Sequence, residues 1–534
     1  MNKLSWRFPL SQIHKYDWTL IGLLLGALLV RLAAIVKFPS LHFPDENFQL
    51  FEQGHRYFFG RGLVPWEFTV GSRSPVVPFL LGLVFAAAEP LTGGPEGYLF
   101  VARLLLALSS LAGVAAVYRM GQRVSPTHAV LGGLVTATWF EFVYFAGRPL
   151  TEGLATTVLL VGLSLASVSE RELIGRRLTY IGFCFGLCVM LRLQLLPGIL
   201  IAWIWVGRSQ VERWALMAVG ALMPVAVFGI ADAVVWGEPF HSYFETVRLN
   251  LFQGVASHFG TAPLDWYLRL LAAQWSYATP LLLLLILLRT RSSALWILVA
   301  LGILLTHSAI PHKEYRFIFP VATCLIVVAA MASADLSESL RARRRRWAPA
   351  ARLITFLIAC TWVGVSAVLA FAPPFRAEWF TSRDVIEAEF LLAKQSSLCG
   401  ILLYDYPWWE TGGYAHLHRN VPFYELPEQS SANASRVAGA FNAVLLKRSS
   451  VADFPREYTL LKCMGAGGAE DVCVMMRNGN CTRIPQFPSC DVAPAVNSDP
   501  SASDPCHTQF SLPPDAPVNR REVRVAERAG APII

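Results

Sequence analysis

The chain has 534 residues, of which 54% are hydrophobic and only 15% are charged, and its mean hydropathy is positive. This balance excludes a water-soluble domain, and repeated apolar runs of about bilayer length predict a polytopic membrane protein. The formal net charge of +8 is spread over short connections between those runs. Basic residues in such connections face anionic lipid, so we expect the bilayer and no nucleic acid as a partner.

Eleven apolar runs predict transmembrane helices. The first run carries Arg31 and is followed by no small-residue cleavage site, so we interpret it as a span and not as a signal peptide. Residues 76–90 form a further apolar run that is short and contains Pro78. In chain order the eleven spans are 17–37, 97–118, 127–146, 152–168, 178–195, 197–207, 213–235, 268–288, 293–309, 317–333 and 351–372.

The arginines of the short connections decide the orientation. If the N-terminus is cytoplasmic and residues 76–90 do not cross, every arginine-rich connection lies in the cytoplasm, as the positive-inside rule requires. We therefore interpret 76–90 as a juxtamembrane or half-inserted helix, although the sequence leaves a crossing open. The arginines concerned are Arg119, Arg123, Arg171, Arg176, Arg177, Arg208, Arg213, Arg289, Arg291 and those of the cluster 341–346. The exoplasmic connections are then 38–96, 146–152, 236–267 and 310–317.

The first exoplasmic loop holds a charged segment that begins like a helix. Pro44 suits the first turn, and Asp45 and Glu46 suit the positive end of the helix dipole. A continuing helix would place four polar residues on one stripe: Asp45, Gln49, Glu52 and Arg56. Its aromatic residues could lie on the membrane surface: Phe48, Phe51, Tyr57, Phe58 and Phe59. The segment thus holds a carboxylate at the membrane lip, unless it is an ordinary amphipathic connector.

The character of the chain changes after residue 375. Residues 381–395 predict a capped amphipathic helix, and four apolar runs predict short strands at 401–406, 443–448, 458–464 and 472–477. We predict a membrane domain over 1–375, a small exoplasmic α/β domain over 376–492, and a disordered tail over 493–534, where Pro, Ser, Asp and Ala dominate. Six cysteines fall in this exoplasmic part and predict disulfides with open pairing: Cys399, Cys463, Cys473, Cys481, Cys490 and Cys506.

The charged residues of the exoplasmic side indicate group transfer. No Gly-rich phosphate loop, dinucleotide fingerprint or zinc-ligand spacing occurs, so we expect neither a soluble nucleotide donor nor a metal. Three arginines lie within spans near their outer ends and indicate a cationic cavity: Arg31, Arg103 and Arg192. A carboxylate there could take the proton of an attacking hydroxyl while cations hold a departing phosphate.

Several motifs resemble one enzyme family. HFPDENFQ (42–49), the pair Glu52 and His55, PWEF (65–68) and RSPVVP (73–78) resemble the first exoplasmic loop of family twenty-two glycosyltransferases. These are the polyprenyl-phosphate-mannose-dependent mannosyltransferases of GPI-anchor and N-glycan precursor assembly. Residues 249–267 resemble a later loop of the members that add the third mannose of the GPI core. HKEYRFIFP (312–320) is similar to the family signature H-K-E-x-R-F-x-x-P.

The resemblance implies a GT-C fold, here all-α with about eleven transmembrane helices, and an inverting transfer of mannose. The donor would be dolichyl- or polyprenyl-phosphate mannose and the acceptor a hydroxyl of a lipid-linked glycan, with no metal or other cofactor. Asp45 would be the base, with Glu46 as the adjacent alternative. The residues that would bind the donor phosphate are Arg73, Arg148, His258, His312, Lys313 and Arg316. A second acid and acceptor contacts would come from Glu52, His55, Glu152 and Trp66.

The sequence leaves alternatives for the membrane in which the protein lies and for its functional class. The protein would lie in the endoplasmic reticulum membrane with a lumenal site, or in a bacterial plasma membrane with a periplasmic site. The competing class is a polytopic transporter or lipid flippase. Against it, the chain shows no paired inverted repeat and no acidic residues deep in several spans.

Overall fold

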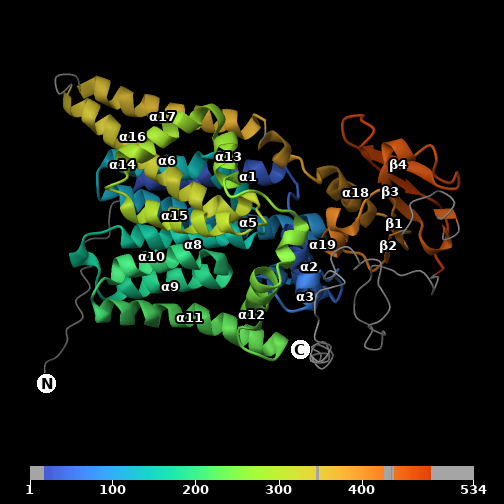
Figure 1. Ribbon diagram of the computed structural model, residues 1–534. Coiled ribbons are helices and arrows are strands. Elements are labelled where there is room, and N and C mark those ends of the chain that lie inside the picture. The colour runs from blue at the N-terminus through green and yellow to red at the C-terminus, as the bar shows by residue number, and fades with distance from the viewer. Residues whose placement is uncertain (1–16, 344–347, 374, 426–433, 436–437, 483–534) are drawn as a thin grey trace.

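The computed structural model describes residues 17–343, 348–373, 375–425, 434–435 and 438–482. A long helical bundle carries a small α/β domain at one end (Figure 1). The basic cluster at 341–346 is only partly among the described residues, and the predicted tail at 493–534 lies outside them.

Every predicted span is helical. Among the described residues six helices are long and apolar enough to cross a bilayer, or seven if the bent pair α6 and α7 is one span. The predicted count of eleven therefore stays a prediction, because the remaining spans are shorter apolar helices. The bundle helices are α1 (Trp18–Lys37), α5 (Pro95–Gln122), α6 (Pro126–Thr138), α7 (Phe140–Ala146), α8 (Thr151–Ala166), α9 (Gly175–Leu191), α10 (Leu196–Gly207), α11 (Val211–Trp236), α13 (Trp266–Trp275), α14 (Thr279–Arg289), α15 (Ala294–Ala309), α16 (Phe319–Arg343) and α17 (Ala348–Phe371).

Helix α16 is the centre of the bundle. In its apolar window 89% of the residues are buried, against 17–39% in the other five long helices. Small residues recur between Val321 and Ala334 and let α6, α14 and α15 approach closely. The other helices keep an apolar face on the outside, which is what a bilayer requires.

The two ends of the bundle differ in charge. Asp17 caps α1 by accepting a hydrogen bond from the Leu20 amide (3.2 Å) and pairs with Arg119 of α5 (3.3 Å). Ion pairs also join the other arginine-rich connections at this end, between Arg208 and Glu170 and between Arg289 and Asp335. The predicted exoplasmic loops and the α/β domain lie at the opposite end (Figure 1).

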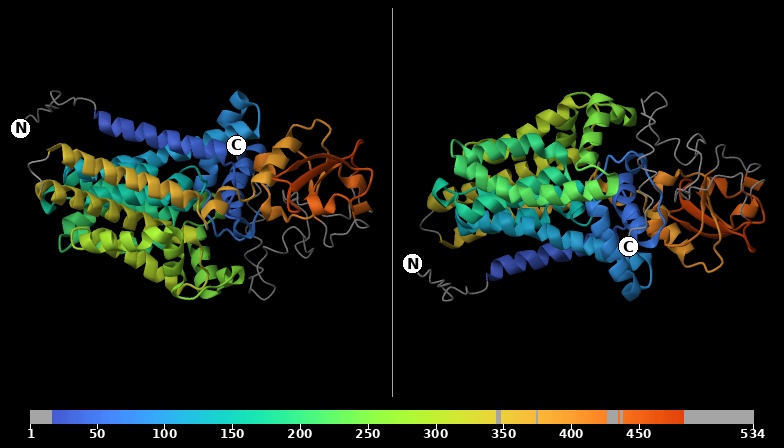
Figure 2. Two further views of the ribbon diagram at one scale, coloured as in Figure 1. Left: turned by 90° about the horizontal axis from the view of Figure 1, so that it is seen from above. Right: turned by 90° about the horizontal axis from the view of Figure 1, so that it is seen from below.

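The segment 76–90 forms α4 (Val76–Thr92), which packs on α2 (Glu52–Phe59) and α5. It lies at the end of the bundle next to the α/β domain (Figure 2). Whether α4 enters the bilayer stays a prediction.

Arg31 satisfies the open carbonyls of a broken helix. The chain bends by 54° between α6 and α7, where Trp139 is extended. This break removes the helical partners of the preceding carbonyls. The Arg31 guanidinium donates to the carbonyls of Ala137 (2.8 Å) and Thr136 (3.2 Å), and Ser366 donates to that of Thr138 (2.8 Å). Arg31 does not line the pocket that contains Arg192, but it lines a second cavity together with Arg148, so its predicted role in a cationic cavity stays a prediction.

The C-terminal domain is built on a five-stranded mixed sheet. Strand order is β2-β1-β3-β5-β4, with β1 parallel to β2 and β3, and β5 antiparallel to β3 and β4. The sequence predicted strands β1, β3, β4 and β5 and helix α18, but it did not predict the short strand β2. Two disulfides join Cys399 to Cys481 and Cys463 to Cys473, while Cys490 and Cys506 lie outside the described residues. The elements are α18 (Arg383–Ala393), β1 (Ile401–Leu403), α19 (Gly413–Leu417), β2 (Phe423–Glu425), β3 (Ala443–Lys447), β4 (Thr459–Met464) and β5 (Val472–Met476).

Candidate active site

The charged segment of the first loop is not one regular α-helix. Residues Glu46–Phe51 form a π-helical turn before α2, and the Glu52 amide donates to the Asn47 carbonyl five residues earlier. Such a turn holds more residues than an α-turn, so it rotates the side chains that come after it. Asp45 and Gln49 line a pocket, whereas Glu52 does not. The predicted single polar stripe is therefore wrong from Glu52 onward.

The aromatic side of the segment also differs from the prediction. Phe48 and Phe51 are buried inside the protein and do not face a membrane surface. Phe48 packs edge-on against Trp408 of the C-terminal domain, with ring centroids 4.8 Å apart. Phe51 packs against Phe85 of α4 at 5.4 Å. These contacts fix the segment between the bundle and the C-terminal domain.

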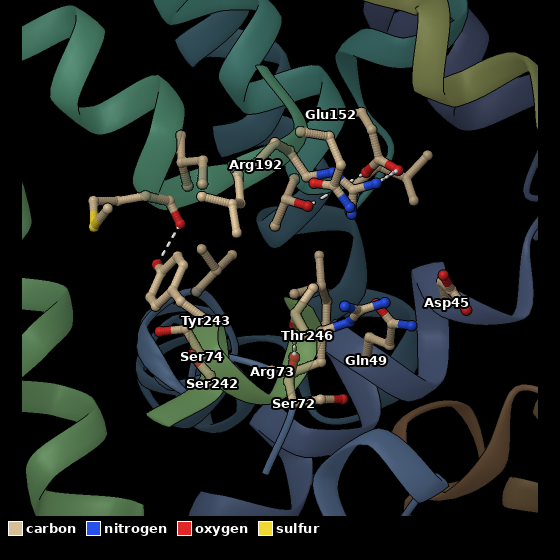
Figure 3. Close-up of a pocket in the computed structure, with 18 of the residues that line it drawn as sticks. Asp45, Gln49, Ser72, Arg73, Ser74, Glu152, Arg192, Ser242, Tyr243 and Thr246 are labelled. Carbon is tan, nitrogen blue, oxygen red and sulfur yellow. Dashed lines mark hydrogen bonds and ion pairs between the residues drawn. The ribbon is translucent and has the colours of Figure 1, made fainter. Parts of the chain in front are cut away.

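The pocket lies at the end of the bundle nearest this domain and encloses about 690 Å³, part of it open to solvent. Arg192 and Glu152 lie on one wall, Arg73 and Gln49 lie across from them, and Asp45 lies at the side (Figure 3). Another part of the lining is apolar and comes from Val77, Met190, Leu191, Leu193 and Phe228. The pocket can therefore hold a molecule that is charged at one end and apolar at the other.

Three arginines and two carboxylates supply the charge of the pocket. Arg316 donates to Asp45 Oδ2 (2.5 Å) and lies 3.6 Å from Glu152 Oε1. Arg192 pairs with the same Glu152 oxygen at 3.0 Å. Arg73 donates from Nε to Gln49 Oε1 at 3.0 Å. Counted over the lining side chains alone, three guanidinium groups face two carboxylates, which is a formal excess of one positive charge.

The signature at 312–316 contributes Arg316 and supports it. Arg316 Nε donates to Glu314 Oε2 (2.7 Å), and His312 Nε2 lies 3.0 Å from the other oxygen of Glu314. Burial alone would raise the pKa of Glu314, but the charges of Arg316 and His312 lower it to about 2. The hydrogen bond to Glu314 raises the pKa of His312. Glu314 therefore stays ionised and holds Arg316 in place.

His312 and Lys313 join two loops instead of lining the pocket. His312 Nδ1 contacts the Gly260 carbonyl (3.0 Å), and Lys313 Nζ donates to the carbonyls of Ala262 (2.8 Å) and Ile310 (2.6 Å). His258 contacts the carbonyl of Val255 in its own turn at 3.1 Å. None of these three predicted phosphate ligands lines the pocket.

Glu46 and Arg148 form a buried pair beside the pocket. Both oxygens of Glu46 lie 2.9 Å from Arg148 Nη1, and Glu46 Oε1 also accepts from the backbone amides of His42 and Phe43 (3.2 Å). Glu46 is fully buried. The pair therefore holds the start of the loop, and neither residue lines the pocket that contains Asp45, although Arg148 lines the second cavity.

Glu52 and His55 contact the C-terminal domain. Glu52 accepts from the backbone amides of Tyr414 (3.0 Å), Ala415 (2.8 Å) and Leu63 (2.8 Å). His55 Nε2 lies 2.9 Å from His418 Nδ1. Burial raises the pKa of Glu52 to about 7 and lowers that of His55 to about 4. They join the two domains and do not line the pocket.

Trp66 is buried and stacks on Phe259, with centroids 6.2 Å apart. It thus packs the short helix α3 (Trp66–Thr69) against the 236–267 connection. It is not among the residues that line the pocket.

Some lining residues carry no motif of their own. Arg192 was identified only as an arginine inside a span. Ser242, Tyr243 and Thr246 belong to α12 (His241–Val247), and their position in a predicted exoplasmic connection was the only signal. Thr246 donates to the Ser72 carbonyl (2.6 Å) and Tyr243 to that of Met190 (2.5 Å). These bonds hold α12 against the pocket.

Comparison with known proteins identifies the family. The model of the Alg9-like mannosyltransferase family matches residues 23–418. GPI mannosyltransferase 3 of Yarrowia lipolytica is 26% identical over 77% of this chain and 78% of its own length. Mannosyltransferase APTG1 of Arabidopsis thaliana is 22% identical over 73% and 74%.

A solved structure has the same fold. ArnT from Cupriavidus metallidurans, bound to undecaprenyl phosphate, is 14% identical, covers 86% of this chain and 98% of its own, and superposes with a TM-score of 0.56. This confirms the expected GT-C-like membrane fold. Since the family match spans most of the chain, from α1 through α19, this chain belongs to the Alg9-like mannosyltransferase family and is a membrane-embedded glycosyltransferase.

Proposed function

We propose that the chain is an inverting mannosyltransferase that uses a dolichyl- or polyprenyl-phosphate mannose donor. One observation carries this proposal: Asp45 lies in a pocket with three arginines, while its neighbour Glu46 is buried against Arg148. The pocket thus pairs one accessible carboxylate with a cationic wall. A base and a phosphate site are the two parts that such a transfer needs.

The charge of the pocket suits this donor. A polyprenyl-phosphate sugar is a phosphodiester with one negative charge, which matches the single excess positive charge of the lining. When the bond from the sugar C1 to the phosphate oxygen breaks, the leaving polyprenyl phosphate gains a second negative charge. Arg73, Arg192 and Arg316 would stabilise that charge more strongly in the transition state than in the ground state.

The reaction takes one step in this scheme. The acceptor hydroxyl oxygen attacks the sugar C1 from the face opposite the phosphate, and its proton passes to Asp45. The new glycosidic bond forms as the C1–O bond to phosphate breaks, so a β-linked donor gives an α-mannoside. Glu152 lies between Arg192 and Arg316 and would position both guanidinium groups.

The names of the relatives favour one acceptor and one compartment. They include a GPI mannosyltransferase, so we favour a GPI-type precursor, with an N-glycan precursor or a bacterial glycolipid next. The same names favour the endoplasmic reticulum membrane with a lumenal site over a bacterial plasma membrane with a periplasmic site. We propose no metal, since three guanidinium groups supply the positive charge.

Purified protein incubated with dolichyl-phosphate mannose and a panel of lipid-linked acceptors tests the proposal. Asp45→Asn keeps the shape of the side chain but removes the base, so we expect transfer to fall by about 10²–10⁴-fold. Donor binding should be largely kept, because the side-chain oxygen of Asn can still accept the hydrogen bond from Arg316.

Asp265→Asn is the matched control. The Asp265 side chain is about half exposed and pairs with Arg269 four residues further along, so its loss should leave transfer unchanged. No transfer to any acceptor of the panel would contradict the proposed function. Normal transfer by Asp45→Asn would leave the function standing and remove Asp45 as the base.

A further inference from the structure

The PWEF motif places a carboxylate directly behind the pocket wall. Glu67 lies on α3, is only 7% exposed, and is not among the residues that line the pocket. Its backbone carbonyl accepts a hydrogen bond from the Ser72 amide (2.7 Å), which closes a turn. The turn brings the next residue, Arg73, back toward the Glu67 side chain.

A chain of two hydrogen bonds joins Glu67 to Arg73. Gln49 Nε2 donates to Glu67 Oε1 (2.8 Å), and Arg73 Nε donates to Gln49 Oε1 (3.0 Å). A guanidinium is only a donor, so Gln49 must turn its carbonyl toward Arg73. Its amide NH₂ must then face an acceptor, and Glu67 is that acceptor.

We propose that Glu67 is a positioning residue that fixes Arg73 through Gln49 for binding of the donor phosphate. This inference rests on the proposed function, in which Arg73 binds that phosphate. An arginine side chain has many rotamers, and a ligand must otherwise remove this conformational entropy on binding. Within the described residues Arg73 has this one hydrogen bond, through Nε, so both Nη groups stay available to a phosphate.

The link does not depend on the charge of Glu67. Burial, and then the charge of Asp45, raises the pKa of Glu67 to about 7. Protonated or ionised, the carboxyl keeps an oxygen that accepts from Gln49. Glutamine at position 67 offers the same oxygen, whereas methionine fills similar space and offers none.

A double-mutant cycle on mannosyl transfer tests this role, with kcat/KM for the donor as the readout. We expect Arg73→Met to lower it by about 10²-fold, and Glu67→Met by about tenfold, a factor that corresponds to about 1.4 kcal/mol. The double variant should be no worse than Arg73→Met alone, because Glu67 acts only through Arg73. Glu67→Gln should keep most of the wild-type kcat/KM that Glu67→Met loses.

Glu389→Met is the matched control for removing a buried carboxylate. Like Glu67, Glu389 is buried, but it accepts from the Gly412 amide in the C-terminal domain. The Glu389→Met variant should have a lower melting temperature, while kcat/KM of its folded fraction should equal that of the wild type. If Glu67→Met does not fold, Gln49→Leu breaks the same chain in the middle and should show the same non-additivity with Arg73→Met.

The outcomes separate the inference from the proposed function. Additive losses, or a normal Glu67→Met beside an impaired Arg73→Met, would overturn the positioning role and leave the function intact. Normal transfer by both Arg73→Met and Asp45→Asn would instead remove the proposed site itself.

Discussion

Neighbouring carboxylates of the first loop differ in role because their partners differ. Asp45 faces the pocket and Arg316, whereas Glu46 is enclosed by Arg148 and two backbone amides. Glu52 accepts from three backbone amides instead. A carboxylate is a candidate base only where an incoming hydroxyl can reach it, which favours Asp45.

Glu52→Gln should change how stability depends on pH. The folded-state pKa of Glu52 is about 7, above the ordinary 4.5, because the carboxyl is buried. Its contribution to stability is therefore fully present below pH 4.5 and is lost as pH rises through about 7. The shift corresponds to about 3 kcal/mol. Melting temperatures from pH 5 to 8 should fall more for the wild type than for Glu52→Gln.

The comparison with Glu52→Gln cancels the histidines at the same interface. His55 and His418 titrate in both proteins, so they drop out of the difference. Glu387→Gln, on the outer face of α18, is the control and should follow the wild type. If melting temperature depended on pH in the same way in the wild type and in Glu52→Gln, ionisation of Glu52 would not reduce stability.

Part of this site could be predicted from the sequence, because several charged side chains of the pocket belong to recognisable sequence motifs. Asp45, Arg73, Glu152 and Arg316 come from four separate segments and line one pocket, while their predicted roles stay predictions. His258, His312 and Lys313 do not, because a motif identifies a loop and not the direction of each side chain. Arg192 was predicted in a cationic cavity from its place in a span, and Gln49 on the polar stripe of Asp45, but only tertiary contacts show that both line this pocket.

At the scale of the element, the site depends on two irregular helices. The π-turn at Glu46–Phe51 directs Gln49 to the pocket and Glu52 to the C-terminal domain. The break between α6 and α7 leaves open carbonyls that Arg31 and Ser366 satisfy. Neither irregularity changes the hydrophobic period of the sequence, so periodicity predicted continuous helices at both places.

Arg31→Met should destabilise the bundle without acting on the pocket. It removes hydrogen bonds from a charged donor to carbonyls that no water can reach, each worth about 1.5–3 kcal/mol. We expect a melting temperature lower by several degrees and an unchanged KM for the donor in the folded fraction. Arg291→Met, in the exposed connection between α14 and α15, is the control and should melt like the wild type. A raised KM with normal melting would instead place Arg31 in the binding site.

At the scale of the whole molecule, the bundle separates two kinds of polar surface. The arginine-rich connections lie at one end and the pocket lies at the other, beside the C-terminal domain (Figure 1). Glu52, His55 and Tyr98 bond this domain to the first loop and to α5, so the domain and the pocket share one segment. The family match extends to residue 418 and thus includes the domain's side of this contact.

This separation predicts labelling from opposite sides of a membrane. Ser396 in the C-terminal domain and Ser292 between α14 and α15 are both exposed, and serine-to-cysteine changes alter little else. In sealed microsomes an impermeant maleimide should label Ser292→Cys directly and Ser396→Cys only after permeabilisation, because the positive-inside rule places the arginine-rich end in the cytoplasm. The wild type sets the background from the native cysteines. Labelling of both variants from one side would contradict the separation, and with it the proposed lumenal position of Asp45.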